Sequence, residues 1–129
     1  GDVVSEIRAA THGDGVDVLL EMSGNQAAIN QGFAALRYGG FASLLGLPGR
    51  ALNDFDLANH IVFKGATVYG VSGRKMFETW YQTRALLGDG RVDIGPIITH
   101  RLPLERFEAA FTMMLEGVAA KVALFPNGM

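Results

Sequence analysis

The 129-residue sequence contains no cysteine, and this absence removes several chemistries at once. Disulfide bonds, zinc sites built from thiolates and a cysteine nucleophile are all excluded for these residues. The three histidines, His12, His60 and His100, lie far apart and show neither an HxxxH nor an HExxH spacing. We therefore do not expect this chain alone to hold a zinc ion.

Long apolar runs and basic clusters are also missing. No apolar stretch approaches the ~20 residues that a membrane span needs, and the opening GDVVSEIRAA lacks the basic-then-apolar pattern of a signal peptide. A formal net charge of −2 argues against a nucleic-acid partner or an anionic membrane surface. We expect a cytoplasmic protein with no nucleic acid and no membrane among its partners.

Motifs that bind phosphate are absent as well. There is no GxxxxGK[ST], and the closest approach to G-x-G-x-x-G, Gly13-x-Gly15-x-x-Val18, has no third glycine. It also precedes a strand, whereas the dinucleotide fingerprint follows a strand and opens a helix. We interpret Gly13-Asp14-Gly15 as a plain turn, so the pyrophosphate-binding turn is absent from this chain.

The sequence does contain a strand–helix–strand pattern in residues 16–47. Residues 16–20 form a nearly continuous apolar run, which is typical of a parallel strand covered on both faces. A second apolar strand is expected at residues 41–45, before Gly46-Leu47-Pro48-Gly49. Two parallel strands joined by a helix are half of a nucleotide-binding α/β sheet.

The helix of this unit has a start, a buried face and an end in the sequence. Asn25 is a suitable N-cap. Ile29, Phe33 and Leu36 fall at helical spacing and predict one buried stripe. We expect Gly39-Gly40 to end the helix, because glycine adopts the left-handed conformation of a helix end without a Cβ clash.

Further elements follow along the chain. The patterns predict strands at residues 66–71, 96–102 and 121–125, and helices at residues 74–87 and 103–115, the last with a buried stripe of Phe107, Phe111 and Met114. The predicted class is α/β, the second half of a doubly wound parallel sheet (a partial Rossmann fold) with a C-terminal strand–helix–strand segment. Because the chain lacks an initial Met and opens inside a predicted helix, we expect it to be a fragment.

Several strings resemble a known family. FKGATVYGVSGRKMFETWYQTRALL, PIITHRLPLERFEAAF and KVALF are similar to the L-threonine 3-dehydrogenases, zinc-dependent and NAD-linked members of the medium-chain dehydrogenase/reductase superfamily. VDVLLEMSGNQAA and GGFASLLGLP fit the same family, so the resemblance covers essentially the whole chain. The strings GRxMFETW and ITHRxPL are more specific than the general superfamily pattern.

The resemblance implies a three-part parent enzyme. A catalytic domain with the zinc ligands comes first, a Rossmann domain follows, and the chain then returns to the catalytic domain. Residues 1–90 would be the C-terminal half of the NAD-binding domain, and residues 91–129 the returning segment. The zinc ligands, the Gly-rich turn and the acidic ribose-binding residue would all lie upstream of Gly1. The implied cofactors are thus NAD, at a partial site, and a zinc ion with no ligands in this chain.

The resemblance also implies cofactor contacts in three turns after strands and at one lysine. Leu45-Gly46-Leu47 would lie beside the nicotinamide half of NAD, and the backbone of Val71-Ser72 would meet the carboxamide. Ser23-Gly24 ends a strand at the crevice where α/β sheets bind ligands. Lys121 corresponds to a cation that reaches the cofactor phosphates, although the family usually has Gly-Lys where this chain has Ala120-Lys121. No catalytic residue and no metal ligand is carried over.

Structural roles compete with some of these assignments. Ser72 could serve as a cap for the next helix, and Lys121 could be a solvated surface lysine. Glu21 ends a strand and would otherwise invite an acid–base role. With no partner identifiable in the sequence, we interpret Glu21 as structural.

Two functional hypotheses remain. In the first, the chain is part of an oxidoreductase that transfers a hydride from L-threonine or a related secondary alcohol to NAD with the help of zinc, and it is inactive alone. In the second, it is a stand-alone, non-catalytic half-Rossmann module for nucleotide binding or association. The resemblance implies that the stretch from Ala66 to Val71 pairs across a dimer. The open edge at Val16–Glu21 also invites another chain, so we expect a homo-oligomer through one of these segments or both.

Overall fold

The computed structural model describes residues 1–128 and divides the chain into two compact units, Gly1–Gly73 and Arg74–Met129. The elements of the first unit are α1 (Val3–Ala10), β1 (Val16–Glu21), α2 (Gln26–Ala35), β2 (Leu36–Leu44), the π-helical turn η1 (Ala58–Val62) and β3 (Thr67–Gly70). Those of the second are α3 (Glu78–Gly88), the short turn η2 (Gly95–Ile97), β4 (His100–Pro103), η3 (Leu104–Arg106), α4 (Phe107–Leu115) and β5 (Val122–Phe125). The predicted α/β class with parallel strands is confirmed.

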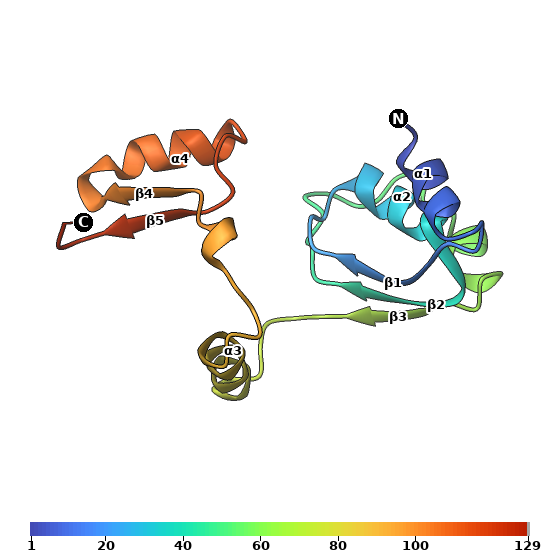
Figure 1. Ribbon diagram of the computed structural model, residues 1–129. Helices are drawn as coiled ribbons and strands as arrows, with labels where there is room; N and C mark the ends of the chain where they lie inside the picture. Colours follow the sequence, from blue (N-terminus) through green and yellow to red (C-terminus); the bar gives the residue numbers. More distant parts are fainter. Residues whose placement is uncertain (129) are drawn as a thin grey trace. The chain divides into compact units, whose positions relative to one another are not determined.

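The first unit is one parallel sheet with helices on one face. Its strand order is β1-β2-β3, and both pairings are parallel. Helices α1 and α2 lie together on one side of these strands (Figure 1). The core forms between α2 and the sheet, where four buried side chains pack: Ile29, Phe33, Leu36 and Ala42.

Helix α2 begins as its sequence predicts but ends earlier. The Asn25 side chain caps it, accepting hydrogen bonds from the backbone N–H groups of Ala27 at 2.9 Å and Ala28 at 3.2 Å. The predicted end at Gly39-Gly40 is wrong, because the helix ends at Ala35 and Leu36 already belongs to β2. The predicted stripe is buried all the same, since Leu36 points into the core as a strand residue and is fully buried.

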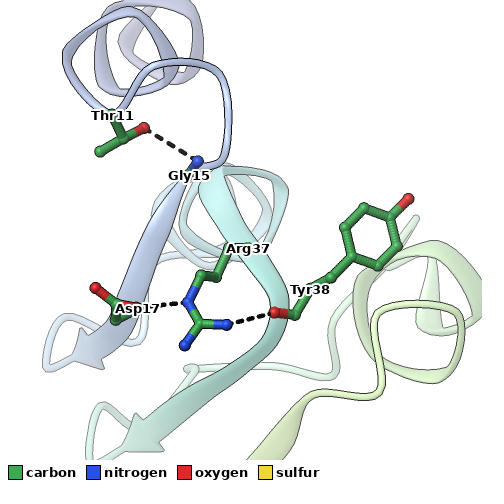
Figure 2. Close-up of polar contacts among 5 residues, drawn as sticks. All are labelled: Thr11, Gly15, Asp17, Arg37 and Tyr38. Atoms are coloured by element: carbon green, nitrogen blue, oxygen red, sulfur yellow. Dashed lines mark hydrogen bonds and ion pairs between the residues drawn. The ribbon is translucent and has the colours of Figure 1, made fainter.

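The start of β2 contains an irregularity that uses a glycine. Val16 pairs with Leu36, but Val18 pairs with Phe41, so β2 bulges between these two pairs. Gly39 lies within the bulge at a φ of 67°, a left-handed conformation that favours glycine. Figure 2 shows the polar contacts beside it: Arg37 bridges from Asp17, with 2.5 Å between Nε and Oδ1, to the carbonyl of Tyr38. The two predicted end-of-helix glycines therefore serve a strand distortion.

Within the first unit, only one face of strand β1 is covered. Leu19 packs on the core, whereas Val18 and Leu20 on the other face are 50% and 65% exposed. The expectation that this apolar run is covered on both faces is therefore wrong within Gly1–Gly73. The reason is that α2 packs on the face of Leu19, whose side chain lies against Gly32, and α1 lies beside α2 on the same side of the strands (Figure 1). β1 also has no second neighbour among the described residues, so one of its edges is open.

The second unit is smaller. Strands β4 and β5 pair in parallel, with Arg101 opposite Ala123, and α4 contacts both strands. Ala110 is the buried residue of α4, while Phe107, Phe111 and Met114 are exposed, so the predicted buried stripe is wrong. A two-stranded sheet offers too little surface to cover three large side chains of one helix.

Candidate functional site

The three predicted cofactor turns of the first unit all follow the carboxyl ends of parallel strands. Ser23-Gly24 follows β1, Leu45-Gly46-Leu47 follows β2, and Val71-Ser72 follows β3. The backbone extends the strand pairing into these turns, since the N–H of Leu45 donates to Glu21 at 2.9 Å and that of Val71 donates to Leu44 at 2.8 Å. The carboxyl edge of such a sheet is where α/β folds bind ligands.

The first two turns are packed backbone against backbone at a pair of glycines. Gly24 has a φ of 65°, and a Cβ placed on it would lie 2.5 Å from the carbonyl carbon of Leu47. A Cβ on Gly46 would lie 2.1 Å from the nitrogen of Gly24 and 2.8 Å from that of Ser23. No larger residue fits at either position without moving the opposite turn. Glycine at these two places sets how closely the turns approach.

Glu21 is the residue that joins the two turns, and it is 4% exposed. Its Oε1 accepts hydrogen bonds from the Ser23 backbone at 2.9 Å, from the Ser23 hydroxyl and from the Gly24 backbone at 3.0 Å. Its backbone carbonyl accepts from Leu45 at 2.9 Å and from Gly46 at 3.1 Å. The carboxylate of Glu21 therefore binds the first turn, and its backbone carbonyl binds the second.

The electrostatics of Glu21 follow from these contacts. Burial of the carboxyl group raises its pKa, because a charged group loses hydration. The hydrogen bonds donated by Ser23 and Gly24 favour the carboxylate, outweigh the burial, and leave the pKa of Glu21 below its ordinary value. Glu21 is therefore an anion at neutral pH and accepts every hydrogen bond that it makes.

The Ser23 hydroxyl makes its hydrogen bonds to groups within the chain. It donates to the Glu21 carboxylate and accepts from the backbone N–H of Asn25 at 3.0 Å. Because a hydroxyl has one proton to donate, Ser23 has no further side-chain donor for a ligand while these bonds hold.

A pocket of about 360 Å³ opens beside the two turns. It is lined by Gly24, Asn25, Gln26, Pro48, Gly49, Arg50 and Leu52. Gln26, one of the lining residues, pairs with the backbone of Asn53. Its side-chain NH2 group donates to the Asn53 carbonyl at 2.6 Å, and its side-chain oxygen accepts from the Asn53 N–H at 3.2 Å. Small-molecule sites run from ~300 to 1,000 Å³, so the pocket has room for part of a dinucleotide.

The remaining predicted residues lie elsewhere. Ser72 is exposed after β3. Lys121 belongs to the second unit, where its side chain is exposed and its backbone carbonyl accepts from Thr99 at 3.0 Å, just before β5. The structure therefore gathers Ser23, Gly24, Leu45, Gly46 and Leu47, and it places Val71 beside Leu44. The cofactor role of all eight positions stays a prediction.

Clusters of metal ligands are absent from the part of the chain that the structure describes. In residues 1–128, no group of three or more His, Cys, Asp or Glu side chains is placed to hold a metal ion. None of the helices described is long and apolar enough to cross a membrane.

The fold and the site define a class of protein: a parallel α/β sheet whose carboxyl edge carries close-packed glycine turns. Sequence comparison shows to which family of this class the chain belongs. The family model described as zinc-binding dehydrogenase matches residues 1–89. The chain therefore belongs to the zinc-binding dehydrogenase family.

Curated relatives are similar over nearly the whole chain. The L-threonine 3-dehydrogenase of Bacillus velezensis is 50% identical over 125 residues, which are 97% of this chain and 36% of the relative. The L-threonine 3-dehydrogenase of Symbiobacterium thermophilum is 46% identical over 127 residues, 98% of this chain and 36% of the relative. The resemblance to this group is confirmed, and the chain spans about a third of the length of these relatives.

Solved structures match at the level of fold. An alcohol dehydrogenase from Thermotoga maritima is 31% identical with a TM-score of 0.81, and the match covers 96% of this chain and 34% of the other. The 2R,3R-butanediol dehydrogenase from Bacillus subtilis is 25% identical with a TM-score of 0.79, covering 97% of this chain and 35% of that chain. The partial Rossmann class predicted from the sequence is confirmed by these matches.

Proposed function

We propose that this chain supplies the nicotinamide side of the cofactor cleft in an NAD-dependent, zinc-assisted L-threonine 3-dehydrogenase. Residues 1–90 form half of the NAD-binding domain in this proposal, and residues 91–129 return to the catalytic domain. The observation that carries it is the 44–50% identity to L-threonine 3-dehydrogenases over almost all of the chain. The location of the predicted turns at one edge of the sheet supports it.

Each predicted residue has a defined task in this proposal. Leu45-Gly46-Leu47 forms a wall beside the nicotinamide ring, with Gly46 allowing close backbone approach. Val71-Ser72 offers backbone groups to the carboxamide, and Ser23-Gly24 bounds the crevice. Lys121 neutralises a phosphate charge. When bound, NAD accepts the hydride and zinc polarises the alcohol oxygen, but the ligands of zinc come from outside this chain.

The chain alone is inactive in this account. Without a Gly-rich turn at a helix N-terminus, most of the binding of the cofactor pyrophosphate is lost. Zinc, NAD and L-threonine added to the purified 129-residue chain should give no NADH above the buffer rate. Turnover above that rate would contradict the assignment of a partial site.

A chimera tests the function itself. The matching segment of the Bacillus velezensis enzyme, 36% of its length, is replaced by this chain and the product is assayed with NAD and L-threonine. We expect threonine-dependent NADH formation. A matched graft of a segment from an alcohol dehydrogenase controls for the effect of grafting, and it should lose activity with threonine. A folded chimera without turnover would contradict the proposal.

A second candidate function, association between copies, is favoured by the open edge of β1. The middle of that strand has no charged side chain, and Val18 and Leu20 are half-exposed apolar residues on one face. The Val16–Glu21 edge, the stretch from Ala66 to Val71, or both, would pair with a second copy. This association is compatible with the dehydrogenase proposal, and sedimentation of the chain over a range of concentrations tests it.

A further inference from the structure

Glu21 is buried at the junction of two turns, and the dehydrogenase proposal assigns no task to it. A buried carboxylate is costly unless it is hydrogen-bonded, and the hydrogen bonds that Glu21 makes offset this cost. These hydrogen bonds go to residues of the two turns: three donors of Ser23 and Gly24 meet the carboxylate, and the N–H groups of Leu45 and Gly46 meet the backbone carbonyl. They link Ser23 and Gly24 to Leu45 and Gly46.

We propose that Glu21 is a positioning residue that sets the spacing between the Ser23-Gly24 turn and the Leu45-Gly46 turn, and thereby the affinity for the nicotinamide half of NAD. This inference rests on the proposed function. Glu21 acts through the two turns and touches neither substrate nor the transferred hydride.

The geometry explains why a carboxylate is needed here. Three donors converge on the side chain: the backbone N–H groups of Ser23 and Gly24 and the Ser23 hydroxyl. A carboxylate has only acceptors and satisfies all three donors. A glutamine side chain carries an NH2 group in place of one of the two oxygens, and the hydrogens of that group would face the donor hydrogens of the turn. A Cβ on Gly46 would lie 2.4 Å from Oε2 of Glu21, so the carboxylate also forms part of the floor of the second turn.

The second oxygen of Glu21 has acceptor capacity left. Oε2 receives a single, longer hydrogen bond, 3.2 Å from the Gly24 nitrogen that is shared with Oε1. The stronger bonds all go to Oε1. The Ser23-Gly24 turn is therefore held mainly through one oxygen. A glutamine that keeps its oxygen at the Oε1 position turns its NH2 group toward the N–H of Gly24, so replacing Glu21 by Gln should loosen the Ser23-Gly24 turn first.

The first test measures how firmly the Ser23-Gly24 turn is held in the 129-residue chain. Glu21→Gln should raise amide hydrogen exchange at Ser23 and Gly24, whose N–H groups donate to the carboxylate, by roughly tenfold relative to the core of α2. The amides of Leu45 and Gly46 donate to the backbone carbonyl of residue 21, which the substitution keeps, and should change less. Asp17→Asn is the matched control, because it removes a carboxylate from the same strand whose partner is the exposed Arg37. Unchanged exchange at Ser23 and Gly24 in Glu21→Gln would overturn the inference.

The second test measures cofactor affinity in the chimera described above. Glu21→Gln should raise KM for NAD by roughly tenfold, the loss of one charge-assisted hydrogen bond, and change kcat less than twofold. Ile29→Val, a mild core truncation in the same unit, controls for simple loss of stability and should leave KM unchanged. Equal KM changes in both variants, or a loss confined to kcat, would overturn the inference.

The two proposals fail differently. An unsubstituted chimera without activity contradicts the dehydrogenase function, while the exchange measurement on the chain still decides whether Glu21 holds the turns. An active chimera whose Glu21→Gln variant keeps the parent KM for NAD contradicts the positioning role alone.

Discussion

The Nζ atom of Lys64 lies 2.5 Å from the carbonyl oxygen of Phe33, at the end of α2. The same ammonium also donates to Ala34 at 3.0 Å and to Leu36 at 2.5 Å, and Lys64 is almost fully buried. These carbonyls are among the last of the helix, which an α-helix leaves without internal partners. Lys64 therefore acts as a side-chain cap that lets the chain pass from α2 straight into β2.

Lys64→Met should destabilise the first unit by about 1–3 kcal/mol, because the buried carbonyls of Phe33 and Leu36 lose the ammonium donor. The carbonyl of Ala34 still accepts from Arg8 at 2.9 Å. Urea denaturation followed by NMR signals of the first unit measures this. Arg50→Met, at an exposed cation of the same unit, is the control and should change stability by less than about 0.5 kcal/mol. Equal stability of the two variants would show that Lys64 does not cap the helix.

Gly46→Ala should destabilise the first unit by about 1–3 kcal/mol, the usual cost of inserting a methyl group where there is no space. The added Cβ would lie 2.1 Å from the nitrogen of Gly24. Gly49→Ala is the matched control in the same loop, since a Cβ there meets nothing within 4 Å. A Gly46→Ala protein as stable as Gly49→Ala would mean that the two turns are not packed as described.

The lowered pKa of Glu21 predicts a loss of stability in acid. The folded state favours the carboxylate, so its contribution is fully present above the unfolded value of ~4.3 and is lost as pH falls through the lowered folded pKa. Denaturation midpoints should therefore fall below about pH 4.5 more steeply in the parent chain than in Glu21→Gln. Parallel pH profiles would contradict this electrostatic account.

His60 predicts a second pH dependence at higher pH. Its ring lies 5.2 Å from that of Phe55, centroid to centroid. Burial lowers its pKa, the charge of Lys64 lowers it further, and Asp56 raises it less. Because the folded state favours the neutral ring, stability should be full above the unfolded pKa of ~6.5 and decline as pH falls through the lowered one. His60→Phe keeps the packing and should flatten the profile between pH 7 and 5; an unchanged slope would exclude His60 as its source.

Self-association should depend on the open edge of β1 if the second candidate function is correct. Leu20→Lys places a charge on the exposed face beside that edge, and charged edges resist pairing. Sedimentation velocity should then show a larger monomer fraction than in the parent chain. Tyr69→Lys is the counterpart on β3 and distinguishes the two edges. A monomeric parent chain at high concentration would contradict association through either.

The sequence predicted those features that depend on local chemistry. The Asn25 cap, the buried positions of Ile29 and Phe33, and the parallel strands follow from short-range rules of capping and periodicity. The turn residues were placed after strands because Ser-Gly and Gly-x-Pro-Gly interrupt apolar runs. Such signals lie within a few residues of the element that they define.

Features that depend on distant residues could not be predicted. Lys64 ends α2 from 28 to 31 residues away, and no local pattern at Gly39-Gly40 reveals this. Glu21 looked structural because its partners are mostly backbone N–H groups, which a sequence does not display. The sequence does contain one signal: an acidic residue ends an apolar strand two residues before a Ser-Gly turn. The backbone N–H groups of that turn are the donors nearest to such a carboxylate.

Turnover by the chimera with the Bacillus velezensis enzyme tests the central claim most directly. We expect its kcat/KM for L-threonine to lie within about a hundredfold of the unsubstituted enzyme, because 50% identity preserves the turns but not every packing contact. A folded, zinc-loaded chimera that forms NADH no faster with L-threonine than without it would contradict the account.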